Sequence, residues 1–147
     1  MRPLLHLCWL LAVLAPPAWA QEWAGTVKSV RGDVVVERAG KPLPLAVGDR
    51  VFPRDKLVTG KDSRVGVTLR DDTLISTGAN SQLVVAEFAF DPATQNGNVL
   101  LSVLRGVSAM VSGLVAKSSP DAMRVTTPTA TAGIRGTEFI VEVEGGE

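Results

Sequence analysis

The residue types that most often carry catalysis or hold transition metals are confined to the start of this chain. Its single cysteine is Cys8 and its single histidine is His6. Without the first 20 residues, the chain has neither a Ser/His nor a Cys/His pair for nucleophilic catalysis. Zinc sites also draw most of their ligands from these two residue types. The sequence therefore indicates a non-enzymatic protein that needs no cofactor.

Acidic side chains leave two further kinds of chemistry open. A pair of carboxylates can hydrolyse a glycosidic bond, and an Asp-rich turn can bind calcium. The candidate calcium ligands are Asp62, Asp71 and Asp72. These residues are scattered over separate turns and lack the regular spacing of a calcium-binding loop. Hydrogen bonding within the turns is the simpler interpretation.

An apolar segment at the start of the chain bears on where the protein acts. Arg2 precedes a run from Leu4 to Leu14, and Ala18-Trp19-Ala20 places small residues at the two positions that a signal peptidase reads. This order predicts a secretory signal peptide at residues 1–20 and a periplasmic protein. The alternative is a short membrane anchor, but a spanning helix needs about 20 apolar residues. We therefore expect no transmembrane anchor after cleavage.

Cleavage after Ala20 would leave residues 21–147, enough for one domain. This part holds 14 basic and 15 acidic residues and no basic block, so it lacks the electrostatic footprint of a nucleic-acid-binding protein. It also contains 20 valines and 11 threonines, with Gly and Asp recurring between them. This composition predicts an all-β domain of short strands and Gly/Asp turns with little helix.

A nine-residue pattern occurs twice, 18 positions apart. Thr59–Val67 (TGKDSRVGV) matches Thr77–Val85 (TGANSQLVV), with Thr, Gly and Ser identical at their positions. Each copy is a turn followed by an alternating strand. The repeat predicts stacked coils of a small β-solenoid or β-roll, with Val67 and Val85 as buried neighbours on successive strands. The alternative is a sandwich-like domain in which the copies are two hairpin arms with similar turns.

The segment from Thr127 to Phe139 (TPTATAGIRGTEF) has the most specific composition. Its threonines and isoleucine favour extended backbone, and Gly133 and Gly136 permit conformations or close approaches that a Cβ would obstruct. We expect a strand, a tight corner at Gly133–Gly136, and a second strand at Thr137–Val143.

Arg135 is the charged residue of this corner. A buried guanidinium has to be paired or hydrogen-bonded. We therefore expect Arg135 to act as a structural anchor, with Asp49 and Asp55 as candidate partners. Contact with a ligand is the alternative role.

This segment resembles the TPTAT-x-G-[VI]-RGT-x-F signature that closes domains of the ferric-citrate regulator (FecR) family. The resemblance continues through Val47-Gly48-Asp49 and Asp62-Ser63-Arg64, and it spans about residues 25–139. It implies that residues 21–147 form a single FecR-type domain, without naming an activity. The signature residues are Thr127, Pro128, Thr129, Ala130, Gly133, Arg135, Gly136, Thr137 and Phe139.

FecR regulators proper join this domain to a cytoplasmic anti-sigma segment, a membrane span and a part that contacts an outer-membrane transporter. A leader stands in place of the first two here, so we expect a free-standing exported domain. Its expected function is to bind or scaffold another envelope protein, with no implied oligomeric state. The alternative is binding of cell-wall polysaccharide. That alternative requires exposed aromatic rings, and most of the five aromatic residues after Ala20 are expected in the core.

Overall fold

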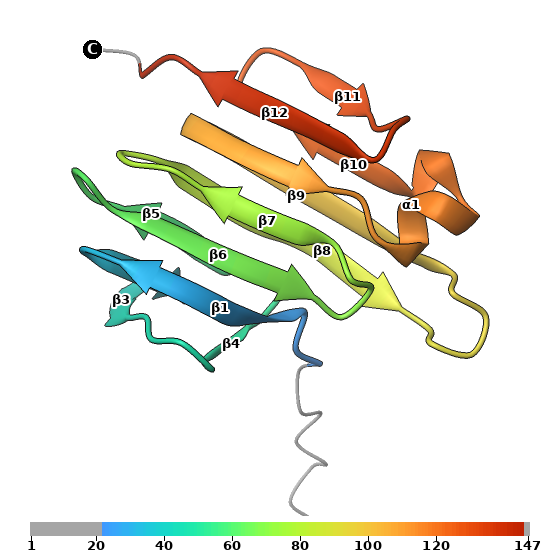
Figure 1. The fold of residues 1–147 in the computed structure, drawn as a ribbon, viewed down its shortest axis with the longest axis horizontal. Coiled ribbons are helices and arrows are strands. Elements are labelled where there is room, and N and C mark those ends of the chain that lie inside the picture. Colours follow the sequence, from blue (N-terminus) through green and yellow to red (C-terminus); the bar gives the residue numbers. More distant parts are fainter. Residues whose placement is uncertain (1–21, 146–147) are drawn as a thin grey trace, which may run out of the picture.

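The computed structural model describes residues 22–145, so the predicted signal peptide lies outside the described residues. Nearly all of the regular secondary structure in residues 22–145 is β-strand (Figure 1), which confirms the all-β prediction. Its strands are β1 (Gly25–Arg31), β2 (Val34–Arg38), β3 (Lys41–Pro44), β4 (Arg50–Val51), β5 (Lys56–Thr59), β6 (Arg64–Leu69), β7 (Leu74–Thr77), β8 (Gln82–Phe90), β9 (Gly97–Val111), β10 (Met123–Thr126), β11 (Thr131–Gly133) and β12 (Glu138–Val143). One short helix, α1 (Leu114–Ser118), is followed by a 3-10 turn at Pro120–Ala122. No helix in residues 22–145 is long and apolar enough to cross a membrane.

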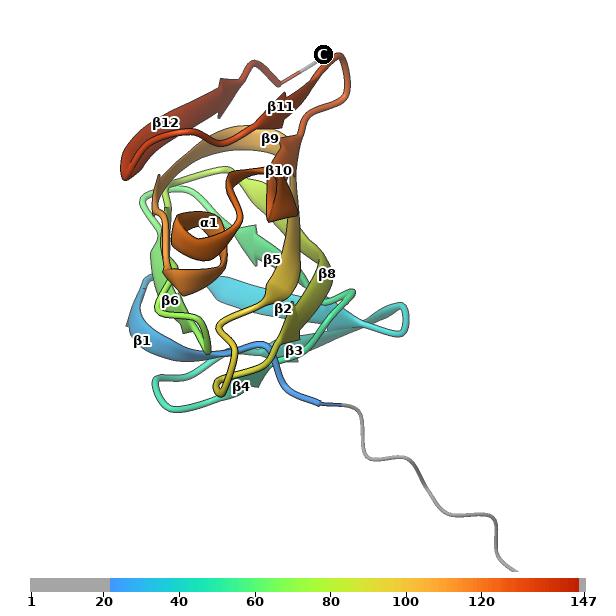
Figure 2. The same cartoon turned by 90° about the vertical axis from the view of Figure 1, so that its right-hand side faces the viewer.

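The strands form one curled sheet that bends into a half-barrel around the core (Figure 2). One half, here called the β6 half, has the strand order β4-β1-β6-β7-β9-β12. The other, the β8 half, has the order β3-β2-β5-β8-β9-β10-β11. Strand β9 belongs to both halves because it bends at Gly106, whose φ of 82° is accessible to glycine at little cost.

The strands that end the two copies of the internal repeat, β6 and β8, lie in opposite halves of the sheet. Val67 and Val85 are both buried. However, β6 pairs with β1 and β7, whereas β8 pairs with β5 and β9. The prediction that these valines are neighbours on successive strands of a solenoid is therefore wrong. The first copy leads from β5 in the β8 half to β6 in the β6 half. The chain then reverses between β6 and β7, so the second copy leads back from β7 to β8, in the opposite direction. This arrangement is that of two arms of a sandwich-like domain.

The identical serines of the repeat connect neighbouring turns. The hydroxyl of Ser63 accepts a hydrogen bond from the backbone N–H of Asp33 (2.9 Å), and the hydroxyl of Ser81 accepts one from the N–H of Val107 (3.0 Å). Each serine also donates to the carbonyl oxygen two residues earlier. In both copies, the serine lies in a turn that crosses between the two halves of the sheet, here called a crossover turn. Its hydroxyl binds this turn to a neighbouring part of the chain by the same kind of hydrogen bond.

A single core of valine, leucine, isoleucine and methionine side chains runs from Ala24 to Val125. Helix α1 lies at one end of the half-barrel (Figure 2). The buried carboxylate of Asp71 holds it there. This carboxylate accepts hydrogen bonds from the N–H and hydroxyl of Thr73 (3.1 and 2.9 Å) and from the N–H of Val115 (3.4 Å). Asp71 thus has the turn-capping role that the sequence favoured over calcium binding.

Candidate binding face

The signature segment lies on the surface, at the end of the half-barrel where β11 and β12 are found (Figures 1 and 2). It begins with a turn in which Thr127 N–H donates to the carbonyl of Ala130 (2.8 Å) and Ala130 N–H donates to the Thr127 hydroxyl (3.1 Å). Strand β11 follows, then a corner at residues 134–137, then β12. The predicted corner and second strand are confirmed, and the first strand is shorter than expected.

Arg135 is not a buried anchor, which corrects the prediction for this residue. Its side chain is 83% exposed, and its ion-pair partner is Asp121, 3.8 Å away and also exposed. The expected partner Asp55 is instead bound by Arg38. The small residues around Arg135 do not mark close packing, because a Cβ built on Gly133 would meet no atom within 4 Å. Gly136 does need its glycine conformation, with a φ of 143°.

Two hollows flank the signature segment. One of about 470 Å³ is lined by Leu104, by residues 127–129 and by residues 142–144. The other, of about 390 Å³, is lined by Ala116, Pro120, Asp121, Ile134, Arg135 and Gly136. Five signature residues therefore line a surface depression: Thr127, Pro128 and Thr129 in the first, Arg135 and Gly136 in the second. Ala130, Gly133, Thr137 and Phe139 line neither of these two hollows.

Strand β12 forms the outermost strand of the β6 half at this end. It pairs with β9 on one side and, within residues 22–145, with no strand on the other. The side chains of Phe139, Val141 and Val143 are half-buried against the core, whereas those between them point outward. We call the two hollows and β12 together the signature face.

Exposed apolar side chains gather on the outer side of the β6 half, next to β12. They are Leu74 on β7, Val107 and Val111 on β9, and Ile140 on β12. The pairing places Leu74 opposite Val111, so these two side chains share one side of the sheet. Ile140 is 70% exposed. Sequence reasoning missed this group because its members come from three strands, and the alternating pattern of β12 is the one local signal for it.

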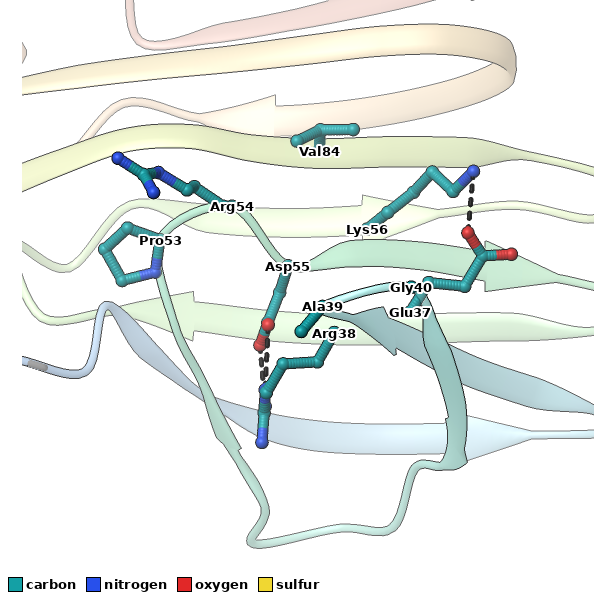
Figure 3. Close-up of a pocket in the computed structure, with 9 residues that line it drawn as sticks. All are labelled: Glu37, Arg38, Ala39, Gly40, Pro53, Arg54, Asp55, Lys56 and Val84. Atoms are coloured by element: carbon teal, nitrogen blue, oxygen red, sulfur yellow. Dashed lines mark hydrogen bonds and ion pairs between the residues drawn. The ribbon is translucent and has the colours of Figure 1, made fainter.

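A larger hollow, of about 560 Å³, lies where β2 pairs with β5 and contains several charges (Figure 3). Arg38 reaches the buried Asp55 with two hydrogen bonds (Nε to Oδ1, 2.9 Å; a terminal nitrogen to Oδ2, 2.7 Å). These bonds raise the pKa of Arg38 above its usual value. Lys56 pairs with Glu37 at 2.8 Å. Four of the charges in this hollow are thus neutralised in pairs, which indicates a structural role.

The geometry offers no metal-binding constellation in the part of the chain that the structure describes. Within residues 22–145, no three His, Cys, Asp or Glu side chains are grouped so that they would hold an ion. Asp62 and Asp72 lie exposed in separate turns, both with positive φ, while Asp71 serves α1.

The family model described as FecR protein matches residues 55–147. The chain belongs to this family. The matched range of this FecR-family chain includes both copies of the repeat and the whole signature face. Strands β1–β4 precede it, yet β1 pairs with β6 and β2 pairs with β5. Val27 of β1 and Val36 of β2 belong to the same core. A solved structure described as a cell surface anchoring domain is 24% identical over 44% of this chain and 87% of its own, with a TM-score of 0.43. No curated protein shows significant similarity to the chain.

Proposed function

We propose that this FecR-family chain is a non-enzymatic, exported module of the cell envelope that binds another envelope protein through its signature face. The observation that carries this proposal is the exposure of the signature. Thr129, Arg135 and Gly136 lie on the surface and line hollows. Signature residues that are needed for packing are expected in the core. Signature residues on exposed loops more often contact a partner.

The electrostatics of the chain support a protein partner over a catalytic role. In the charged hollow between β2 and β5, the carboxylate of Asp55 holds Arg38. The buried carboxylate of Asp71 is committed to three hydrogen bonds. Both buried carboxylates therefore hold neighbouring parts of the fold together, which supports a structural role for each. The proposed periplasmic location rests on the arrangement of residues 1–20, which has the charged, apolar and small-residue regions of a secretory signal in order.

Binding of cell-wall polysaccharide is supported less well, because arginines lie over three of the aromatic rings on which sugars could stack. The guanidinium of Arg38 lies 4.7 Å from the centre of the Phe52 ring. Trp23 has Arg50 at 5.2 Å and Arg70 at 5.4 Å. Arg70 also lies 5.9 Å from the centre of the Phe88 ring. These cation–π contacts use ring faces on which a pyranose would otherwise stack.

Photo-crosslinking in the envelope of the producing cell tests the proposed function. The photoreactive amino acid p-benzoylphenylalanine is placed at position 129 in the signature face. The matched control is position 61, an exposed residue in a crossover turn outside both hollows. We expect a discrete crosslinked envelope protein from position 129 and none from position 61. The proposal fails if position 129 gives no product, or if both positions give the same products.

A further inference from the structure

We infer that β12 is an acceptor edge for a strand of the partner, and that this strand carries Lys or Arg on both sides of an apolar residue. The inference rests on the proposed function and deepens it by naming the chemistry of the bound segment. Addition of a strand to an open sheet edge is a common mode of peptide recognition, in which backbone hydrogen bonds give affinity and alternate side chains give specificity.

The pairing of β12 with β9 fixes which backbone groups are available. Ser112 N–H donates to the carbonyl of Thr137 (2.7 Å), and the register continues with Phe139 opposite Met110 and Val141 opposite Ser108. In an antiparallel pair, the groups of alternate residues point toward the neighbouring strand and those between them point away. The N–H and C=O of Glu138, Ile140 and Glu142 are therefore directed to the open side of β12.

The other ends of the sheet are poor acceptors by comparison. Strand β3 contains Pro42 and Pro44, and proline removes backbone donors from an edge. Strand β4 has two residues and β11 has three. Strand β12 has six residues and contains neither proline nor lysine. It is thus the long edge that contains no proline or lysine, and its outward charges are two glutamates, Glu138 and Glu142.

The exposed apolar group continues to this edge. In the β-sheet register, Ile140 lies opposite Ala109, and the exposed Val107 and Val111 of β9 lie on either side of Ala109 at alternate positions. A strand added beyond β12 would place one of its side chains next to Ile140, on the same side of the sheet. An apolar residue at that position would cover Ile140 and extend the apolar group.

The negative charges of Glu138 and Glu142 on β12 favour basic residues on either side of the apolar residue in the added strand. Glu138 and Glu142 stand on either side of Ile140 on the outer face, and neither forms an ion pair with any residue from 22 to 145. Arg105 lines the hollow beside Glu142 without reaching ion-pair distance. Lys or Arg opposite these glutamates would be attracted, because opposite charges across a strand pair stabilise it.

The same charges disfavour a second copy of this chain as the added strand. Two β12 strands paired antiparallel with Ile140 opposite Ile140 would place each Glu138 opposite a Glu142. Like charges directly opposite one another destabilise a strand pair. The acidic flanks therefore point to a basic segment from a different protein.

Selection of peptides from a random nonapeptide phage library on the purified protein tests this inference. Selected peptides are re-tested on Ile140→Pro, which removes an outward-directed N–H while leaving the β9 pairing groups in place. The control Ile140→Ser keeps that N–H and shortens the side chain. We expect peptides with an apolar residue flanked by Lys or Arg at i−2 and i+2, bound at least about tenfold more weakly by Ile140→Pro than by Ile140→Ser.

The double variant Glu138→Lys with Glu142→Lys keeps the inference testable if Ile140→Pro does not fold, because both positions are exposed. Selection on this variant should enrich Asp and Glu at the flanking positions instead. The inference is overturned if no selected peptide depends on β12, or if the flanking preference is the same for the wild type and the double variant. Neither result would contradict the proposed function, which is tested separately by crosslinking from positions 129 and 61.

Discussion

Arg38 and Asp55 form a two-point ion pair in which the carboxylate is 1% exposed and the guanidinium reaches the surface. Asp55 also accepts the N–H of Phe52 (2.8 Å), so the same carboxylate closes the turn before β5. The pair joins the end of β2 to the turn that leads into β5.

Loss of Arg38 should destabilise the fold, because it would leave a buried carboxylate without its cation. We expect Arg38→Met to lower the free energy of unfolding by about 3 kcal/mol. The control is Glu37→Gln, which breaks the more exposed pair with Lys56 and should cost less than about 1 kcal/mol. Urea unfolding followed by circular dichroism measures both, and equal small losses would show that the Arg38–Asp55 pair contributes little.

The two repeat serines should contribute to stability by the same mechanism. Ser63→Ala and Ser81→Ala each remove the acceptor of one backbone N–H, that of Asp33 or of Val107. We expect each to cost about 1–2 kcal/mol. Ser76→Ala, on the exposed side of β7, should stay within about 0.5 kcal/mol of the wild type. If both repeat variants unfolded at the same midpoint as the wild type, the hydrogen bonds of these two serines would not stabilise the fold.

Two glycines should respond very differently to substitution by alanine. At Gly106 the φ of 82° is strained for alanine, and a Cβ would lie 2.6 Å from the Cα of Ser81. We expect Gly106→Ala to lose more than about 2 kcal/mol. Gly133→Ala should change stability by less than about 0.5 kcal/mol, since nothing lies within 4 Å of its Cβ position. Thermal unfolding of the two variants measures both effects, and equal melting temperatures would contradict the prediction.

The local features of this fold were predictable from sequence, whereas its long-range pairings were not. The turns at Gly32 and Gly60 and the bend of β9 at Gly106 follow from glycine placed between β-branched runs. The repeat identified two equivalent turns. It did not reveal that β6 and β8 lie in opposite halves, because this depends on the chain reversal between β6 and β7.

The sequence identified the signature segment correctly, but it wrongly predicted that Arg135 in this segment is buried. Small residues around Arg135 suggested close packing, yet burial depends on which other strands cover a segment. Within residues 22–145, β11 and the corner after it have no strand packed over them, and both are exposed. The apolar group around Ile140 was missed for a similar reason, since only the pairing of β7, β9 and β12 brings it together.

Arg135 should therefore be dispensable for folding. We expect Arg135→Ala and Arg135→Lys to unfold within about 0.5 kcal/mol of the wild type, because the side chain and Asp121 are both exposed. Arg135→Ala should reduce the yield of the product crosslinked from position 129. A loss of several kcal/mol in both variants would restore the structural role that the sequence suggested.

Cysteine labelling in the envelope tests the central claim, that the signature face is covered by a partner, most directly. Cys8 is the single cysteine, so Thr129→Cys or Lys61→Cys in a Cys8→Ser background gives one labelling site each. Both positions are exposed in the chain alone. If a partner covers the signature face, a maleimide should label position 129 at least about tenfold more slowly in envelope preparations than in the purified protein, while the labelling rate at position 61 is unchanged. Equal rates at position 129 in both preparations would contradict this claim.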